Sequence, residues 1–334
     1  MSRFLLPSAL PLAAFLVTAC ASTPSVANTP AAPLQAQAAA GLYVANGKLV
    51  DANGVPFIFQ GINFPHAWYA GKWSAAMGQM KARNANSVRM VLATGCRWTK
   101  TEYNVINDMI SAARTNKLVL VLEVHDTTGY GEQAGACTLA HAANYWVGMK
   151  NSLVGHEKHV IINIGNEPYG NVNTAAWTAD TKAAIQTLRS AGLRHTIMVD
   201  APNWGQDWSN TMRNNAAGVF TADPLRNTIF SVHMYGVYNT ASSVNNYISA
   251  FVNAKIPLVV GEFANTFQGS GVAYGTVMSD SKARVNGYMA WSWSGNSGAD
   301  APLDLVNNFN PSSPTAWGSI LFKDLATAKP STLF

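Results

Sequence analysis

The sequence is poor in charged residues. Asp, Glu, Lys and Arg make up only 12% of its 334 residues, whereas 48% are hydrophobic, so the chain has ample apolar material for a core. The formal net charge is +5, but the Lys and Arg residues are scattered and form no basic run. Because a basic run is the usual mark of a nucleic-acid partner, we interpret the charge as a mild surface bias and expect no nucleic acid to bind.

The N-terminal apolar run is too short to cross a membrane. Residues 4–17 follow Arg3 and fall below the roughly 20 apolar residues that a bilayer requires, which indicates the core of a signal peptide. The segment Val17-Thr18-Ala19-Cys20 resembles the lipobox of bacterial lipoproteins, in which the Cys is lipidated after cleavage. We therefore expect a lipoprotein signal at 1–19 and acyl chains on Cys20, which anchor the protein to a membrane facing the periplasm or the cell surface. The alternative is an ordinary secretory signal that is cleaved after residues 36–38.

The segment after this signal has no charged side chain. Residues 20–40 are rich in Ala, Pro, Thr and Ser, which is typical of a disordered tether. We expect the folded body at residues 41–329 as one domain, because α/β barrels of this length form single domains.

Cysteine is scarce as well, since the chain contains only three. No Cys-x-x-Cys spacing occurs, which argues against a zinc site. Cys96 and Cys137 both lie in polar loop sequence, and an exported protein meets an oxidising compartment, so we expect a disulfide between them. Two buried free thiols are the alternative.

What the chain does contain is a repeated unit in which a short apolar run is followed by an amphipathic segment. The segment "YVANGKLVDANGVPF", with Asn-Gly at both turns, predicts a hairpin before the first run. The apolar runs are 57–62, 88–92, 118–122, 160–164, 196–199, 229–232, 258–260 and 288–291. Continuous apolar runs of this kind indicate parallel strands that are buried on both faces.

The segments between the runs have helical periodicity. In "TEYNVINDMISAARTNK", residues 105, 106, 109, 110 and 113 share one face, with Thr101 as a candidate cap. In "SVNNYISAFVNAK", residues 244, 247, 248, 251 and 252 do the same, and Gly192 is expected to end another helix. The alternation predicts an α/β fold, a single (β/α)₈ barrel with a short N-terminal β-hairpin. A doubly wound sheet is the weaker alternative, because no G-x-G-x-x-G follows the first run.

Two acids directly end apolar strands, and in such a barrel the strand ends form the active site. Glu167 follows the fourth run and Glu262 the seventh, so their side chains are expected to face each other across the mouth of the barrel. A facing pair of carboxylates suits glycoside hydrolysis with retention when the groups lie about 5–5.5 Å apart. This chemistry needs no cofactor and no metal, and we expect neither.

Polar and aromatic residues follow the other strands on the same rim. Arg89 could bind the nucleophilic carboxylate, and Asn166 could hold the 2-hydroxyl of the sugar. His125, His233 and Tyr235 could orient the sugar and Glu262. Flat apolar faces on which sugars stack would come from Trp291, Trp204, Trp208 and Trp68. Each residue alone is more simply explained as structural, but together, on ordered strand ends, they favour a site.

These residues carry a resemblance to glycoside hydrolase family 5. The recurrent active-site set of that family falls here, in order, on Arg89, His125, Asn166, Glu167, His233, Tyr235, Glu262 and Trp291. The segments "LEVHDTTGYGE", "NIGNEPYGN", "HTIMVDAPNWGQDW", "IFSVHMYGVY" and "AWSWSGN" are similar to those of one subfamily of bacterial endo-β-1,4-mannanases.

The resemblance implies the roles and the substrate. Glu167 is expected to be the acid/base and Glu262 the nucleophile of an enzyme that cleaves internal bonds of mannan, glucomannan or galactomannan. Its expected partners are β-mannan and mannooligosaccharides, and a monomer is expected. A β-1,4-glucanase with the same machinery remains an alternative, as does a surface lipoprotein that binds glycans without catalysis.

Overall fold

The computed structural model describes residues 41–328 and 333–334. The expected signal peptide, Cys20, the tether and the expected domain end at residue 329 therefore lie outside the described residues. Within the described part of the chain, no helix combines the length and the apolar character needed to cross a bilayer.

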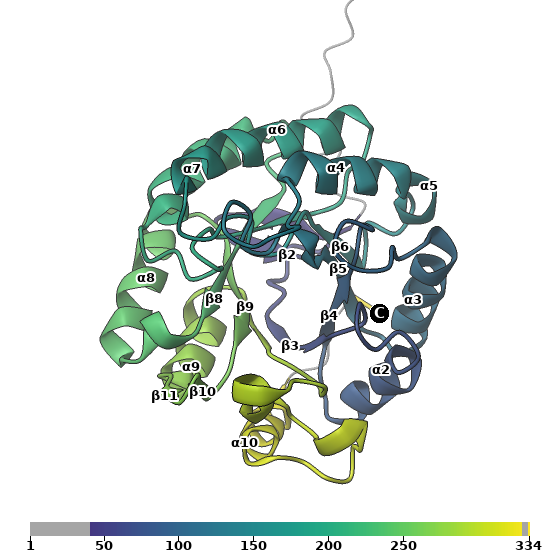
Figure 1. Ribbon diagram of the computed structural model, residues 1–334. Helices are drawn as coiled ribbons and strands as arrows, with labels where there is room; N and C mark the ends of the chain where they lie inside the picture. The colour runs from purple at the N-terminus through teal and green to yellow at the C-terminus, as the bar shows by residue number, and fades with distance from the viewer. Residues whose placement is uncertain (1–40, 329–332) are drawn as a thin grey trace, which may run out of the picture. The chain divides into compact units, whose positions relative to one another are not determined.

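Eight parallel strands close into a barrel, in the order β12-β3-β4-β5-β6-β7-β8-β9, and helices surround it (Figure 1). The strands are β3 (Phe59–Phe64), β4 (Ser87–Leu92), β5 (Val119–Val124), β6 (Val160–Asn163), β7 (Ile197–Asp200), β8 (Thr228–Met234), β9 (Leu258–Phe263) and β12 (Gly287–Ala290). The predicted (β/α)₈ barrel is thereby confirmed, and the doubly wound sheet is excluded.

The helices pack their apolar faces on the outside of the barrel. They are α2 (Trp73–Ala82), α3 (Tyr103–Thr115), α4 (Leu139–Gly148), α5 (Lys150–Leu153), α6 (Trp177–Ser190), α7 (Thr211–Ala222), α8 (Ala241–Ala254), α9 (Tyr274–Arg284) and α10 (Ala316–Leu325). Short 3₁₀ turns occupy His125–Thr127, Thr174–Ala176, Gly236–Tyr238, Gly298–Leu303 and Asn307–Phe309.

Two details of the helix predictions were wrong. Thr101 does not cap α3: Glu102 is the N-cap residue, and the Thr101 hydroxyl instead accepts a hydrogen bond from the backbone N–H of Ala93. Val252 is 39% exposed, so it does not belong to the buried face of α8, which stops at Phe251. Periodicity shows on which side of a helix a residue lies, but it does not show whether a residue at the edge of the apolar face is buried.

The predicted hairpin is confirmed, and it closes the bottom of the barrel. β1 (Tyr43–Ala45) pairs with β2 (Lys48–Val50) around Asn46 and Gly47, both of which have positive φ, as a tight hairpin turn requires. An apolar layer fills the lower barrel above it. This layer consists of Leu42, Leu49, Phe57, Phe59, Val119, Val121, Ile161, Met198, Ile229, Val259, Met289 and Leu333. A second hairpin, β10 (Thr266–Phe267) with β11 (Ser270–Gly271), lies after β9.

Several strands extend further than the apolar runs predicted. β8 continues to Met234 and β9 to Phe263, so His233 and Glu262 lie inside strands and pair with each other across the ladder. The upper interior of the barrel is polar, and for that reason hydrophobicity alone ended these strands too early.

The expected disulfide between Cys96 and Cys137 is present, with Cα atoms 6.4 Å apart. It joins the loop after β4 to the loop after β5, whose 3₁₀ turn carries His125. The two cysteines are 41 positions apart in the sequence, so the bridge fixes two distant segments of the rim to each other.

Candidate active site

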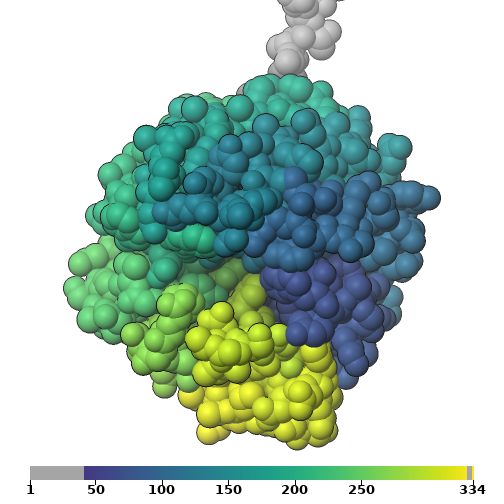
Figure 2. Space-filling model, in the orientation of Figure 1, coloured from purple at the N-terminus to yellow at the C-terminus, as the bar shows by residue number. Residues whose placement is uncertain are grey.

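A cleft of about 500 Å³ opens at the carboxyl ends of the strands. In Figure 2 the surface is hollowed where the yellow segment near residue 300 meets the green and teal loops. Eight of the residues predicted for the site line this cleft: His125, Asn166, Glu167, Trp204, Trp208, Tyr235, Glu262 and Trp291. Arg89 and His233 are fully buried next to them.

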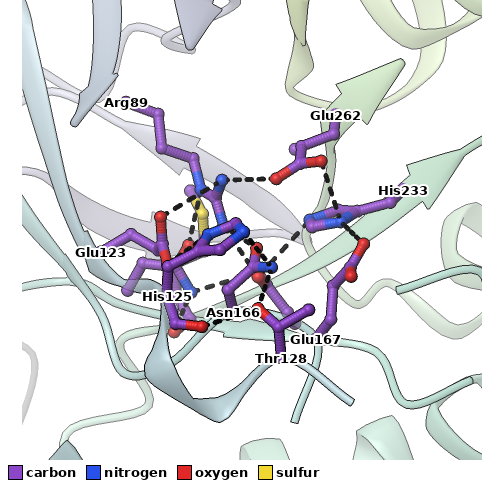
Figure 3. A network of polar contacts seen from close by, with 12 residues as sticks. Arg89, Glu123, His125, Thr128, Asn166, Glu167, His233 and Glu262 are labelled. Carbon is purple, nitrogen blue, oxygen red and sulfur yellow. Dashed lines mark hydrogen bonds and ion pairs between the residues drawn. The ribbon is translucent and has the colours of Figure 1, made fainter. Parts of the chain in front are cut away.

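Arg89 on β4 organises the polar network under the cleft (Figure 3). Its guanidinium has five N–H donors, and each can be matched to an acceptor at 2.7–3.0 Å. The acceptors are the side chains of Asn63, Asn163, Asn166, Asp200 and Glu262. Burial alone would lower the pKa of Arg89, but the carboxylates of Glu123, Asp200 and Glu262 raise it above its usual range, so the side chain remains a cation.

The two glutamates meet at the base of the cleft. Glu167 follows β6 and has a φ of 40°, a left-handed conformation that is strained for a residue with a side chain. One carboxylate oxygen of Glu167, one of Glu262 and a ring nitrogen of His233 all lie within 4.8 Å of one another. The carboxylates are therefore close enough for double displacement, and too close to hold a water molecule for single displacement.

His233 on β8 contacts both glutamates. Its Nδ1 lies 2.7 Å from Glu167 Oε1 and 3.5 Å from Glu262 Oε2. Burial alone would lower the pKa of His233, but the carboxylates of Glu262 and Asp200 and a hydrogen bond to Glu167 raise it to about 10. The ring is therefore an imidazolium at neutral pH.

Local backbone features aim the His233 ring. A β-bulge between Val232 and His233 shifts the register of β8 against β9, a device that re-aims side chains near active sites. Gly205 has a φ of 73°, and a Cβ at this position would lie 2.5 Å from the ring Nδ1 of His233. Glycine is therefore required where the loop after β7 passes over this contact.

Glu262 accepts hydrogen bonds on both oxygens. Arg89 Nη1 donates to Oε1 at 2.7 Å, and the Tyr235 hydroxyl donates to Oε2 at 2.9 Å. Burial raises the pKa of Glu262, and the neighbouring cations His233 and Arg89 limit that rise. Burial together with the neighbouring carboxylates also raises the pKa of Tyr235 well above its usual range, so the phenol keeps its proton and donates a hydrogen bond to Glu262.

Asn166 is held with a defined orientation. Its Oδ1 accepts from Arg89 at 2.7 Å, which places its amide nitrogen toward the Thr128 hydroxyl at 2.8 Å and toward His125 Nε2 at 3.4 Å. His125 Nδ1 in turn lies 3.1 Å from Glu123. Because Arg89 can only donate, the amide of Asn166 cannot flip without leaving a buried donor unpaired.

Aromatic side chains form the walls of the cleft. Trp291 stacks on His125 with ring centroids 5.8 Å apart, and Trp204 donates its indole N–H to Glu132 at 3.0 Å. Trp208 is 55% exposed, as expected for a ring that is free to receive a sugar. Trp68 packs edge-on against His125, 5.2 Å away, and is not among the residues that line the cleft.

Sequence reasoning missed the residues that support this site from below. Asn63 and Asn163 lie within strands and Glu123 near the end of one, where they face Arg89. The available signal was a polar residue inside an apolar run, as for Asn163, or directly after one, as for Asn63 and Glu123, but the sequence does not reveal its partner. Other cleft-lining residues beyond the barrel strands were also missed: Asn171, Asn203, Gln206, Phe267, Gln268, Asp300 and Leu303.

Two clusters of side chains have the geometry of metal ligands among the described residues, but their chemistry does not suit a metal. In the first cluster, Glu167, His233 and Glu262, the ligand atoms already have hydrogen-bond partners: His233 Nδ1 lies 2.7 Å from Glu167 Oε1, and Arg89 and Tyr235 donate to the two oxygens of Glu262. In the second cluster, Cys96 and Cys137 lie near His141, and both sulfurs are held in the disulfide.

Comparison with known proteins places these features in a family. The model of Cellulase (glycosyl hydrolase family 5) matches residues 50–297. The chain is 48% identical over 310 residues to a mannan endo-1,4-beta-mannosidase of Streptomyces lividans, covering 91% of this chain and 80% of the relative.

Solved structures agree with this assignment. The catalytic domain of a mannanase from Streptomyces sp. SirexAA-E superposes with a TM-score of 0.86 at 48% identity, covering 89% of this chain and 95% of that one. The mannohexaose complex of a Thermomonospora fusca beta-mannanase gives a TM-score of 0.84 at 48% identity, covering 88% and 99%. With its barrel, its cleft and its facing glutamates, the chain belongs to glycosyl hydrolase family 5.

Proposed function

We propose that this protein is a retaining endo-β-1,4-mannanase, with Glu167 as the acid/base and Glu262 as the nucleophile. The observation that carries the proposal is the meeting of the two carboxylates, within 4.8 Å, at the base of a cleft with aromatic walls. This separation suits a double displacement that passes through a covalent glycosyl-enzyme.

In the first step, Glu262 attacks the anomeric carbon of the sugar. The glycosidic C–O bond breaks, and Glu167 gives its proton to the departing oxygen, so the leaving sugar keeps the electron pair of that bond. His233 donates to Oε1 of Glu167 at 2.7 Å, which leaves Oε2 to hold the proton that is transferred. Arg89 and Tyr235 orient Glu262 for the attack through one hydrogen bond to each oxygen.

In the second step, water hydrolyses the covalent ester. Glu167, now a carboxylate, takes a proton from the water as its oxygen attacks the anomeric carbon. The bond from that carbon to Glu262 breaks and returns its electron pair to the carboxylate. Two inversions give net retention. The amide nitrogen of Asn166 can exchange its long 3.4 Å contact to His125 for the 2-hydroxyl of the sugar, a contact that strengthens in the transition state.

The choice of mannan as substrate rests on the relatives. Mannan endo-1,4-beta-mannosidases from Streptomyces lividans and Cellvibrio japonicus are 48% and 49% identical to this chain, and a related beta-mannanase was solved with mannohexaose. The matching family is described as Cellulase, and an endoglucanase A of Clostridium longisporum matches at 25% identity over 38% of this chain. A glucanase is therefore the second candidate, on weaker support.

Glu167→Gln and Glu262→Gln are each expected to lower kcat on mannohexaose by several orders of magnitude, because each removes a group that forms or breaks a bond in the transition state. Binding of mannohexaose, measured by calorimetry, should survive in both variants. Gln133→Asn, a change at an exposed site outside the cleft, serves as the control and should retain wild-type turnover. Either Gln variant with near-normal turnover would refute the assignment of roles.

The substrate preference is expected to favour mannan. Release of reducing ends from linear mannan, glucomannan and carboxymethylcellulose should be compared at equal enzyme concentration. Faster cleavage of carboxymethylcellulose would make the glucanase the better description. Binding of mannohexaose with no hydrolysis of any of the three would instead favour the glycan-binding lipoprotein.

We also propose that the protein is exported and anchored through Cys20. The support is the short apolar run after Arg3 and the lipobox-like segment that ends at Cys20. Cleavage before Cys20 and acylation of its thiol would hold the barrel at a membrane, with residues up to 40 as a tether.

In an expressing bacterium, Cys20→Ala is expected to move the protein from the membrane fraction to the soluble exported fraction, because the acylated thiol is lost. The control is Cys137→Ala, which removes a rim cysteine without touching the anchor. An unchanged membrane fraction for Cys20→Ala would show that this thiol is not the attachment point.

A further inference from the structure

A third carboxylate lies behind the catalytic pair and has no role in the steps above. Asp200 ends β7, is 1% exposed and does not line the cleft. Its Oδ2 accepts from Arg89 Nη2 at 2.9 Å and lies 3.4 Å from His233 Nε2. Its Oδ1 accepts from the Asn163 amide at 3.1 Å. Arg89, Asn163, His233 and the Ser231 hydroxyl can thus each present a hydrogen to this carboxylate.

The contact between Asp200 and His233 is an ion pair rather than a short hydrogen bond. The ring Nε2 is buried and has no other polar partner among the described residues. A buried N–H without a partner is costly, and a buried cation without an anion is more so. The far side of the His233 ring therefore depends on Asp200 alone.

We propose that Asp200 is a positioning residue that keeps His233 doubly protonated through both halves of the reaction, so that one fixed cation stays beside the negative charge as it moves between the two catalytic glutamates. The proposal rests on the double displacement described above.

The reason is that the charge on the glutamate pair changes place. Before the first step Glu262 is the anion and Glu167 carries the proton, whereas in the covalent intermediate Glu262 is a neutral ester and Glu167 is the anion. The ring Nδ1 of His233 reaches both, at 2.7 and 3.5 Å. A cation placed in this way stabilises either state without moving, as preorganised electrostatic catalysis requires.

Neither glutamate can keep the His233 ring protonated throughout the reaction, because each glutamate is neutral in one of the two states. Asp200 takes no part in bond making and can be the constant anion. Burial alone would raise the pKa of Asp200, but Arg89 and His233 lower it to about 2, so the carboxylate stays ionised at every working pH. The other charged groups near Asp200 and the His233 ring are Arg89 on β4 and Glu123 on β5. Arg89 donates to Asp200, and the carboxylate of Glu123 partly offsets its charge.

The direct test is the protonation state of His233, measured from its ring ¹⁵N chemical shifts in the uncleaved, full-length protein. The wild type should show an imidazolium up to pH 8, and its signal is assigned by its loss in His233→Gln. In Asp200→Asn, which keeps the shape and removes the charge, the ring should become neutral below pH 8. A wild-type ring that is already neutral at pH 7 would overturn the proposal without any variant.

The pH profile of kcat/KM on mannohexaose gives a second readout, because the direction in which Asp200→Asn shifts the profile distinguishes the two possible roles of Asp200. If Asp200→Asn lets His233 lose its proton, the cation nearest the glutamates disappears, and both limbs of the profile should move to higher pH. If Asp200 has only a packing role, His233 stays charged, the site gains net positive charge, and both limbs should move to lower pH. A shift to lower pH would therefore overturn the proposal.

Asp200→Asn is expected to change kcat much more than KM. We expect kcat at the new optimum to fall roughly 10- to 100-fold, because an electrostatic contact to developing charge is lost, while KM stays within about threefold because Asp200 does not line the cleft. A rise in KM with unchanged kcat would contradict the proposed role.

Asp207→Asn is the matched control. Asp207 is also 1% exposed and lies in the loop after β7, but it accepts from Tyr247 and from the backbone N–H groups of Met212 and Arg213 at the start of α7. Its loss should lower stability and leave the His233 shifts and the profile unmoved. Because the ¹⁵N measurement needs no activity, a failure of the catalytic roles would appear separately, as undiminished turnover in Glu167→Gln or Glu262→Gln.

Discussion

The site depends on a single buried guanidinium. Arg89 gives all five of its N–H donors to side chains on β3, β6, β7 and β9 and on the loop after β6. A rigid planar fork with this many partners fixes the positions of those segments relative to one another, because moving any one of them leaves a buried donor or acceptor unpaired. The placement of Glu262 and Asn166 is thus a consequence of satisfying one side chain at the centre of the barrel.

The barrel interior divides into two layers with different tasks. The lower layer is apolar and is closed by the N-terminal hairpin, so stability comes from ordinary burial there. The upper layer holds Arg89 and His233 as cations among the carboxylates of Glu123, Asp200, Glu167 and Glu262. In the proposed mechanism, a negative charge moves from Glu262 to Glu167, and charges of both signs at these short distances allow that move without a net change of charge in the layer. The upper layer is tolerable in a protein interior because nearly every donor in it meets an acceptor.

Much of this arrangement could be predicted from the sequence, for identifiable reasons. Apolar runs revealed the eight strands, Asn46-Gly47 revealed the hairpin, and Glu167 and Glu262 were identified because each comes shortly after an apolar run. The supporting residues were not predictable in the same way. Asn163 and Asp200 look like any polar residue in or after a strand, and their importance lies in what faces them across the barrel. The bulge at His233 leaves no mark in the hydrophobic pattern, since it depends on how β8 and β9 pair.

In the proposed mechanism, two glutamates at short range hydrolyse a β-glycosidic bond through a covalent intermediate. The stereochemistry of the first product tests it most directly. Proton NMR during the first minutes of mannohexaose hydrolysis, at high enzyme concentration, should show the β-anomer of the new reducing end first, with the α-anomer growing only by mutarotation. Initial formation of the α-anomer would mean single displacement by water, and would contradict the account.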